Sequence, residues 1–279
     1  MPELPEVETI KNELSPRVIG LRFSEVTILD SKPIKRPVVE EFPRKLTGQT
    51  ITGLERRGKY LIFRLSSGKA LVIHLKMTGS LLLDPKQTDR YARVIFHFHD
   101  STQLVFNDRR RLGAIWLAED ELASIHKLGP EPLGPSFTAK ALAQWLHKRQ
   151  APIKAILLDQ GFIAGIGNMY ADEALFAAKI HPMRPANSLS RGEITSLHRA
   201  IIDVLKSAIR SKGASIDTYV RPTGQLGTAH NNFRVAHRGG RPCPICGTSI
   251  QRLAIRNRGS YFCPKCQKSQ FRQNVRLER

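Results

Sequence analysis

The spacing of the cysteines constrains this fold more than any other feature of the sequence. All four stand in the C-terminal part as two Cys-x-x-Cys pairs, Cys243 with Cys246 and Cys263 with Cys266. Each pair can present two thiolates to one tetrahedral ion, and a hairpin between the pairs brings them together. Two redox-active pairs are the alternative reading. We predict a four-cysteine zinc ribbon with one structural Zn²⁺ and no open coordination position for catalysis.

The charge balance indicates a polyanionic partner. The 279 residues include 44 Lys and Arg against 24 Asp and Glu, which gives a formal net charge of +20. Such a field attracts nucleic acid, and an anionic membrane surface is the competing possibility. We find neither a long apolar run nor a secretory signal pattern, so we expect a cytoplasmic protein that binds nucleic acid and no membrane.

Residue periodicity separates a strand-rich part from a helical part. Residues 5–14 have helical spacing, and two hairpins are predicted, one from 60–65 with 70–75 and one from 93–98 with 103–106. A Gly- and Pro-rich linker follows at 128–135, and helical patterns cover 137–148, 153–158, 169–179 and 191–211. The predicted fold class is α+β, with an N-terminal helix and β-sandwich (or barrel), then helices, then the zinc ribbon.

The N-terminus offers an unusual nucleophile. Pro2 directly follows the initiator methionine, and removal of Met1 leaves a secondary amine. An α-amine has a pKa near 8, so an appreciable fraction is neutral at physiological pH. Its attack on a sugar C1′ gives an iminium ion that acidifies C2′ and permits loss of phosphate, with Glu3 placed to handle protons. Many chains begin Met-Pro, and acidic residues often open helices, so this pattern alone favours no chemistry.

Several motifs follow one another in a fixed order along the chain, at residues 2–9, 57–61, 74–80, 128–132, 165–173 and 259–267. Together they resemble formamidopyrimidine-DNA glycosylase, a family of bacterial repair enzymes, and the resemblance runs from Pro2 to about Gln267. It implies a bifunctional N-glycosylase and AP lyase of base-excision repair. Such an enzyme removes oxidised purines, 8-oxoguanine and formamidopyrimidines, from damaged double-stranded DNA. It then cleaves the abasic site by β,δ-elimination through an imine on Pro2.

Two alternatives stay open. The endonuclease VIII type shares fold and nucleophile but prefers oxidised pyrimidines, and we expect Gly there at the position of Leu4. A catalytically silent DNA-binding zinc protein is the alternative from another class, and the intact Pro2, Glu3 and Lys59 argue against it.

The resemblance also implies roles for single residues. Pro2 corresponds to the nucleophile and Glu3 to the general acid/base, while Glu6 matches a second acidic position near the sugar. Lys59 matches a lysine on the phosphate of the damaged nucleotide. The DNA-binding positions that match are Met77 (inserted into the stack), Arg110 (pairing with the orphaned base), Lys154, Asn168 and Arg258. A loop within residues 215–234 is expected to close over the flipped base, with Thr218, Tyr219 and Val220 as candidate contacts.

Two positions depart from the family pattern. Leu112 stands where the family usually has Phe, so it can wedge between bases but cannot stack on them. Arg93 stands where a histidine is expected, which removes a proton-transfer group but leaves a side chain able to hold a phosphate.

We expect a monomer associated with the bacterial nucleoid. The predicted domains are a catalytic β-sandwich at residues 2–130, a helix–two-turn–helix domain at 131–238, a zinc finger at 239–270 and a basic tail at 271–279.

Overall fold

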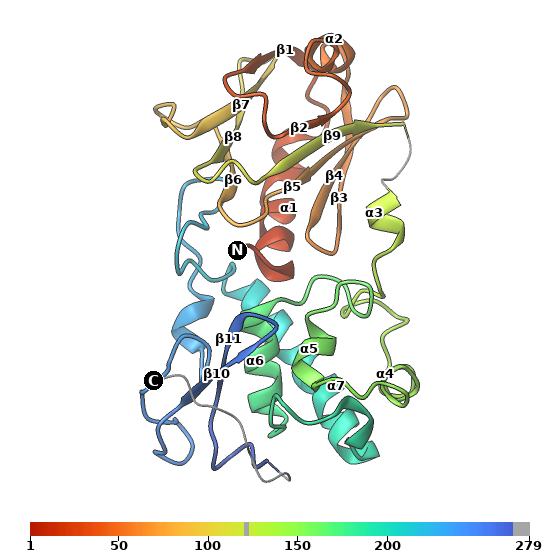
Figure 1. Ribbon diagram of the computed structural model, residues 1–279. Helices are drawn as coiled ribbons and strands as arrows, with labels where there is room; N and C mark the ends of the chain where they lie inside the picture. The colour runs from red at the N-terminus through yellow and green to blue at the C-terminus, as the bar shows by residue number, and fades with distance from the viewer. Residues whose placement is uncertain (120–122, 270–279) are drawn as a thin grey trace. The chain divides into compact units, whose positions relative to one another are not determined.

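The computed structural model describes residues 1–119 and 123–269 (Figure 1). The chain forms two compact units. The first contains Met1–Lys127 and Ala208–His230, and the second contains Leu128–Ser207 and the chain from Asn231 onward. The predicted basic tail at 271–279 lies outside the described residues.

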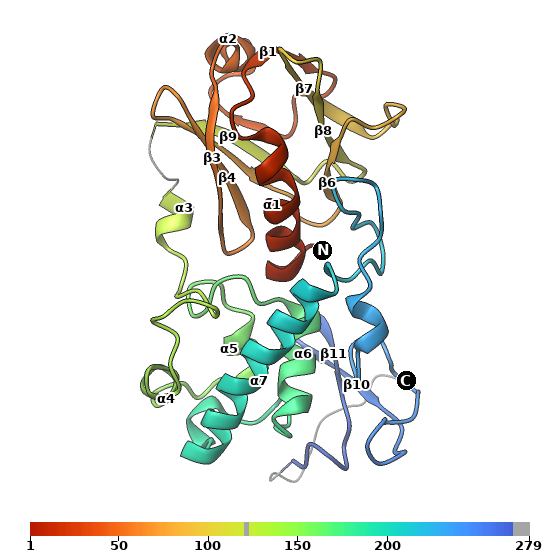
Figure 2. The same cartoon turned by 180° about the vertical axis from the view of Figure 1, so that it is seen from behind.

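Two sheets and an N-terminal helix build the first unit (Figure 2). One sheet has the strand order β1-β7-β8-β6 and the other β2-β9-β5-β4-β3, with only β2 and β9 parallel. Both hairpins predicted from the sequence are present, as β4 with β5 and as β7 with β8. The elements are α1 (Leu4–Val18), β1 (Phe23–Ile28), β2 (Ile34–Arg36), α2 (Glu41–Leu46), β3 (Ile51–Arg57), β4 (Tyr60–Leu65), β5 (Ala70–His74), β6 (Gly79–Leu83), β7 (Ala92–Phe98), β8 (Gln103–Asp108), β9 (Ala114–Ala118) and α3 (Ala123–His126).

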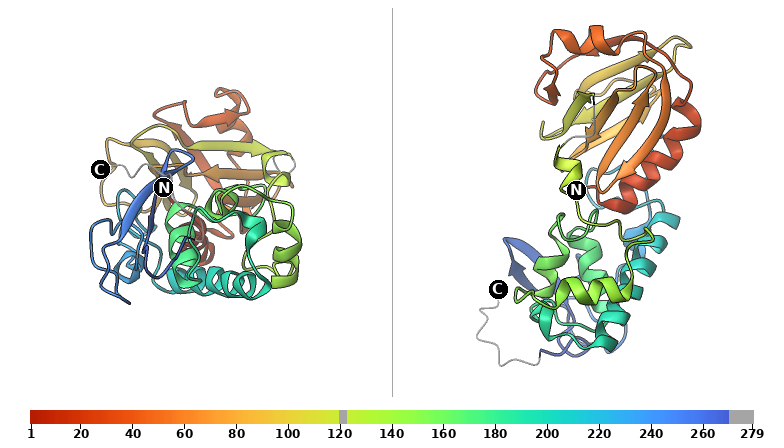
Figure 3. Two further views of the ribbon diagram at one scale, coloured as in Figure 1. Left: turned by 60° about the horizontal axis from the view of Figure 1, so that its bottom comes forward. Right: turned by 90° about the vertical axis from the view of Figure 1, so that its right-hand side faces the viewer.

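One apolar core joins the two sheets to α1. Phe63 of β4, Phe96 of β7 and Phe106 of β8 are all fully buried in it. Helix α1 contributes Ile10 and Leu14, which lie on one face because they are four residues apart. The right-hand view of Figure 3 shows α1 alongside the five-stranded sheet, where it packs on β3 and β4. The shared core makes this unit the predicted β-sandwich.

The second unit is helical and ends in a short hairpin. Its longest helix shows the predicted amphipathic spacing, with Ile194, Leu197 and Ile201 buried. Strands β10 and β11 pair antiparallel and turn through Arg256 and Asn257, both at positive φ, as a two-residue hairpin turn requires. The elements are α4 (Ala139–Leu146), α5 (Ile153–Leu157), α6 (Asn168–Ala177), η1 (Ala186–Ser188), α7 (Arg191–Arg210, of which the part up to Ser207 belongs here), η2 (Ala229–Asn232, of which the part from Asn231 belongs here), β10 (Gln251–Ile255) and β11 (Arg258–Phe262).

These observations confirm the predicted α+β fold class. Within the described ranges, no helix has both the length and the apolarity needed to span a bilayer.

Candidate active site and metal centre

Pro2 and Glu3 lie at the N-terminus of α1, where backbone N–H groups have no partners within the helix. Both residues are buried, and the backbone N–H of Glu3 donates to Glu6 Oε2 at 2.8 Å. Glu6 Oε1 accepts the backbone N–H of Ala214 at 2.8 Å. The Glu6 carboxylate therefore ties the start of the chain to residues 208–230 of the same unit, and it fixes the position of Pro2 and Glu3.

Gly213 and Tyr219 close around the Glu6 carboxylate. A Cβ on Gly213, which has φ +78, would lie 3.0 Å from Glu6 Oε1 and 2.9 Å from Tyr219 Cε1. The Tyr219 ring is 5% exposed and its hydroxyl donates to the carbonyl of Lys212 at 3.1 Å. Burial and the charge of Glu6 raise the pKa of Tyr219, so its hydroxyl stays protonated. Any side chain at position 213 would displace Glu6.

The three predicted base-loop residues differ in their surroundings. Tyr219 packs into the core of the first unit. Thr218 and Val220 are half-buried, and the Thr218 hydroxyl lies 3.4 Å from the carbonyl oxygen of Met77. Thr218 and Val220 thus keep accessible surface for a ligand, whereas Tyr219 supports the loop from inside.

Lys59 occupies the tight turn between β3 and β4. Gly58 and Lys59 are the two turn residues, and Gly58 has φ +55, which glycine adopts at little cost. Arg56 holds this turn against α1, because its Nε donates to Glu8 Oε2 at 2.6 Å and its Nη1 donates to the carbonyl of Gly58 at 3.0 Å. Lys59 is only 6% exposed, so its charge has a defined position.

His74 is a site residue that the sequence reasoning did not assign. It is paired with Tyr60 across the strands, and the two rings pack edge to face at 4.6 Å. Its Nδ1 accepts the backbone N–H of Lys76 at 2.9 Å. Burial, with the charges of Lys76 and Lys59, lowers the pKa of His74 to about 3. The ring is neutral at pH 7 and carries its proton on Nε2. The sequence feature that could have identified His74 is a histidine at the end of a predicted strand, two residues before Lys76.

We predict that His74 makes stability depend on pH. Its pKa is about 3 in the folded protein against 6.5 for an ordinary histidine, so between these values only the unfolded chain binds the proton. The free energy of unfolding then decreases as pH falls from about 6.5, by at most about 1.4 kcal/mol per pH unit from this group. In urea unfolding between pH 7 and 4, His74→Gln should flatten this slope, whereas the exposed His99→Gln should not. Equal slopes for wild type and His74→Gln would contradict the prediction.

Two neighbouring loops of the first unit present exposed side chains. Met77 and Leu112 are each 41% exposed, which is unusual for large apolar residues. Arg110 is exposed as well, and its Nη1 lies 3.2 Å from Met77 Sδ. Arg93, in contrast, points its guanidinium into the protein, where Nε donates to the carbonyl of Asp108 at 2.9 Å. Met77 and Arg110 are thus in contact, with Leu112 two residues further along the same loop, while Arg93 is held by protein partners.

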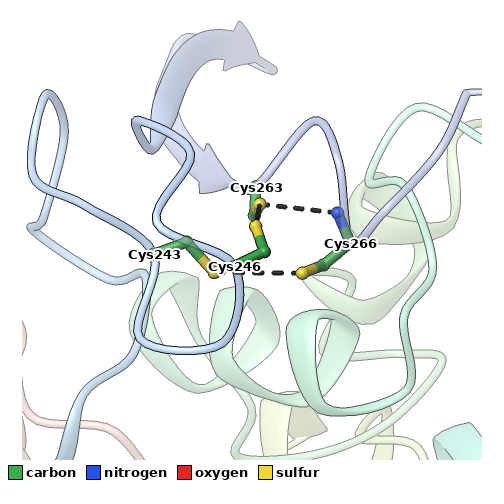
Figure 4. Close-up of side chains that lie close together, drawn as sticks. All are labelled: Cys243, Cys246, Cys263 and Cys266. Carbon is green, nitrogen blue, oxygen red and sulfur yellow. Dashed lines mark hydrogen bonds between the residues drawn. The ribbon is translucent and has the colours of Figure 1, made fainter.

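The four cysteines of the second unit converge on one point (Figure 4). Their Sγ atoms all lie within 4.8 Å of one another, with Cys243 and Cys266 at 3.9 Å and Cys246 and Cys263 at 3.5 Å. A tetrahedral zinc ion with Zn–S bonds of about 2.3 Å requires S–S separations of roughly 3.8 Å. The two measured separations lie within about 0.3 Å of that value, and four sulfur ligands fill all four positions, so the cluster suits a structural ion.

Helix α6 holds the outer edge of β11 through two side chains one turn apart. Asn168 Nδ2 donates to the carbonyl of Gly259 at 2.8 Å, and Asp172 Oδ2 accepts the backbone N–H of Tyr261 at 3.1 Å. Lys154 Nζ lies 2.6 Å from Asp172 Oδ1, and neither side chain has more than 1% of its surface exposed. Lys154 and Asn168, both predicted to bind DNA, thus make contacts within the protein, while Arg258 at the start of β11 is exposed.

We predict that Lys154 stabilises the folded protein through its contact with Asp172 and does not bind DNA phosphate. Lys154→Met leaves Asp172 buried without its ammonium partner. Because burial already raises the pKa of Asp172 to about 7, its carboxyl then takes up a proton, and we expect the free energy of unfolding to fall by about 1–3 kcal/mol. Adding Asp172→Asn, which keeps an acceptor for Tyr261, should recover part of the loss. Thermal unfolding measures both effects. If Lys154 instead bound phosphate, Lys154→Met would leave unfolding unchanged and lower the salt dependence of DNA binding by about one counterion.

Family models match the chain in three consecutive stretches. They are the formamidopyrimidine-DNA glycosylase N-terminal domain at residues 1–115, its H2TH domain at 128–220, and a zinc finger found in FPG and IleRS at 240–268. This succession of domains, with its zinc-finger cysteines, is that of a DNA glycosylase.

Individual relatives agree with these matches. The formamidopyrimidine-DNA glycosylase of Moorella thermoacetica is 46% identical over 253 residues, covering 88% of this chain and 92% of the relative. The Lactococcus lactis Fpg bound to DNA with an abasic site has a TM-score of 0.89 at 36% identity, covering 96% of this chain and 100% of that one. The same protein bound to DNA with an oxidised pyrimidine has a TM-score of 0.88 at 36% identity, with the same coverage.

The chain belongs to the formamidopyrimidine-DNA glycosylase family. It is a DNA glycosylase that acts in base-excision repair of damaged DNA, and the sequence-based predictions of family and enzyme class are confirmed.

Proposed function

We propose that the protein excises oxidised purines, 8-oxoguanine and formamidopyrimidines, from duplex DNA and cleaves the abasic site through an imine on Pro2. The observation that carries this proposal is the buried pair Pro2 and Glu3, fixed at the start of α1 by the Glu6 carboxylate. A nucleophile must be held in one place to react efficiently, and these hydrogen bonds hold it.

The chemistry follows from a secondary amine. The nitrogen of Pro2 forms a bond to C1′ as the bond from C1′ to the base breaks, and the proton that this nitrogen loses is taken up by the departing base. Glu3 then protonates O4′ as the ring opens, which leaves a positively charged iminium ion. Loss of a C2′ proton expels the 3′ phosphate, a second elimination expels the 5′ phosphate, and hydrolysis of the imine frees Pro2.

The proposed DNA-binding residues divide into those that contact DNA and those that act through protein partners. Met77, Arg110, Leu112 and Arg258 are exposed and contact DNA directly, with Met77 and Leu112 filling the space left by the flipped base. Lys59 and neutral His74 bind the phosphate at the lesion, one by charge and one by its Nε2–H. Arg93, Lys154 and Asn168 act through their protein partners. Thr218 and Val220 contact the base, and Tyr219 supports them.

The proposal extends to the metal, the domains and the assembly. One structural Zn²⁺ binds to the four cysteines and supplies folding free energy to the β10–β11 segment. The catalytic domain is residues 2–130, the helix–two-turn–helix domain 131–238 and the zinc finger 239–270. The enzyme acts as a monomer on the bacterial nucleoid, in the cytoplasm.

Oxidised pyrimidines are the second candidate substrate class. The similar Lactococcus lactis structure with an oxidised pyrimidine in its DNA favours testing them. Leu4, where the pyrimidine branch is expected to carry Gly, supports purines as the preferred class.

Borohydride trapping tests the proposal and its alternatives together. The purified protein is mixed with borohydride and a duplex carrying 8-oxoguanine, a formamidopyrimidine, an oxidised pyrimidine or no lesion. We expect the covalent adduct to form fastest with the two purine lesions. Without borohydride, we expect products that carry phosphate at both ends of a one-nucleotide gap. Faster trapping on the pyrimidine duplex would instead favour the endonuclease VIII type. Tight binding with no adduct on any duplex would identify a catalytically silent DNA-binding protein.

A further inference from the structure

Asp108 joins the two loops that carry the exposed DNA-probing residues. It is the last residue of β8 and is 0% exposed. Its Oδ1 accepts the hydroxyl of Thr78 and the backbone N–H of Arg110, the latter at 3.2 Å. Its Oδ2 accepts the backbone N–H of Gly113 at 2.6 Å. A single carboxylate thus receives hydrogen bonds from the Met77–Thr78 loop and from both ends of the loop at 110–113.

Thr78 completes the connection between the loops. Its hydroxyl donates to Asp108 and accepts the backbone N–H of Arg110 at 2.9 Å. Gly113 closes the second loop tightly, since a Cβ there would lie 2.5 Å from Phe106 Cζ and 3.0 Å from Asp108 Oδ2. The distance between the two loops is therefore set by polar contacts at their bases, while their tips stay exposed.

A second carboxylate holds the outer side of the same loop. Arg111, at φ +58, places its Nε 2.5 Å and its Nη2 3.0 Å from the two oxygens of Asp30. Arg93 lies 3.7 Å from Asp30 and donates to the carbonyl of Asp108. Asp108 fixes the loop backbone at Arg110 and Gly113, on either side of the exposed Leu112. Asp30 holds the Arg111 side chain between these two points.

We propose that Asp108 is a positioning residue that holds Met77, Arg110 and Leu112 as one preformed unit for insertion into DNA. This inference rests on the proposed insertion role of those three residues. Rigid loops lose less conformational freedom when they enter the base stack, so fixing their spacing in advance favours insertion. Prior fixing of the loop matters more for Leu112 than for an aromatic residue at this position, because a leucine fills space between bases but gains no stacking interaction with them.

Asp108→Asn is the sharpest change, because it keeps the shape of the side chain. One carboxylate oxygen becomes an NH₂ group that cannot accept, so at least one of its three donors loses its partner. The matched control is Asp100→Asn in the loop between β7 and β8, where the carboxylate also accepts a backbone N–H, from Thr102 at 2.9 Å, but is exposed.

The experiment compares a step that needs insertion with one that does not. Insertion is followed by the fluorescence of 2-aminopurine placed beside 8-oxoguanine in a duplex. Covalent chemistry without insertion is followed by borohydride trapping on a single-stranded oligonucleotide with an abasic site. We expect Asp108→Asn to slow the fluorescence change at least about tenfold and to leave single-strand trapping within about twofold, while Asp100→Asn changes neither. Equal slowing of both steps, or unchanged insertion, would overturn the proposal.

Thr78 provides a second test if Asp108→Asn does not fold. Thr78→Val removes the hydroxyl that links Asp108 to Arg110, whereas Thr78→Ser retains it. Slower insertion for Thr78→Val with normal insertion for Thr78→Ser supports positioning, and equal behaviour of the two variants refutes it. Met77→Ala and Arg110→Ala separate this inference from the proposed function: if neither slows insertion, the insertion role itself is wrong.

Discussion

Pro2→Gly is expected to lower the rate of strand cleavage of an 8-oxoguanine duplex by about 10²-fold or more. The amine of Pro2 is secondary, so its adduct with C1′ becomes an iminium ion whose charge cannot be lost from nitrogen. Glycine supplies a primary amine, whose imine is neutral unless protonated and therefore withdraws fewer electrons from C2′. DNA affinity, measured without borohydride, should change less than about threefold, since none of the proposed direct DNA contacts is altered.

The form of the protein that retains Met1 is the matched control for Pro2. Its Pro2 nitrogen lies in a peptide bond and has no lone pair available for attack, while every side chain is unchanged. Intact-mass measurement of the trapped adduct should show only chains that lack Met1. An adduct that contains Met1, or full cleavage by an enzyme whose terminal amine is chemically blocked, would place the nucleophile elsewhere.

Cys263→Ser is expected to release zinc and to weaken DNA binding by about 10²-fold or more. Structural zinc contributes on the order of 10 kcal/mol of folding free energy to small domains of this kind. The two-stranded β10–β11 ribbon is too small to replace that contribution. Among the described residues, its apolar contacts are limited to Ile250 and the partly buried Tyr261 around Cys243 and Cys263, and to Leu253, Ile255 and Phe262 against Ala155. Loss of the metal should disorder the hairpin that presents Arg258.

Lys265→Gln is the control for the zinc site. Lys265 is exposed in the same knuckle, two residues beyond Cys263, so its substitution tests charge without touching a ligand. Metal analysis and DNA titration of both variants distinguish the outcomes. Tight DNA binding by metal-free Cys263→Ser would show that the ribbon does not contribute to the interface.

Local patterns predicted much of this structure. The Cys-x-x-Cys pairs, the hairpins β4–β5 and β7–β8 and the helix that begins at Leu4 all depend on residues close in sequence. Their geometry follows from strand and helix periodicity, so a single sequence contains the information. The candidate nucleophile could be predicted for the same reason, because it is identified by the position of Pro2 directly after Met1.

The directions in which charged and polar side chains point depend on tertiary contacts, which local sequence patterns do not contain. Lys154 and Asn168 matched DNA-binding positions, but Lys154 pairs with Asp172 and Asn168 binds the backbone of β11. Arg93 is drawn inward in the same way, by Asp30 and the carbonyl of Asp108. The motifs identified these positions as functional but did not show which residue each of them contacts.

The sequence by itself determined the two cysteine pairs of the zinc finger, the order of sandwich, helices and ribbon, and the candidate nucleophile Pro2. Only the tertiary structure decided that Glu6 holds that start through Ala214, that His74 is neutral, and that Asp108 links two loops. The physical reason is the short range of these interactions. Hydrogen bonds act over about 3 Å, and burial decides whether a group keeps its charge, so both depend on neighbours that folding brings together from distant parts of the chain.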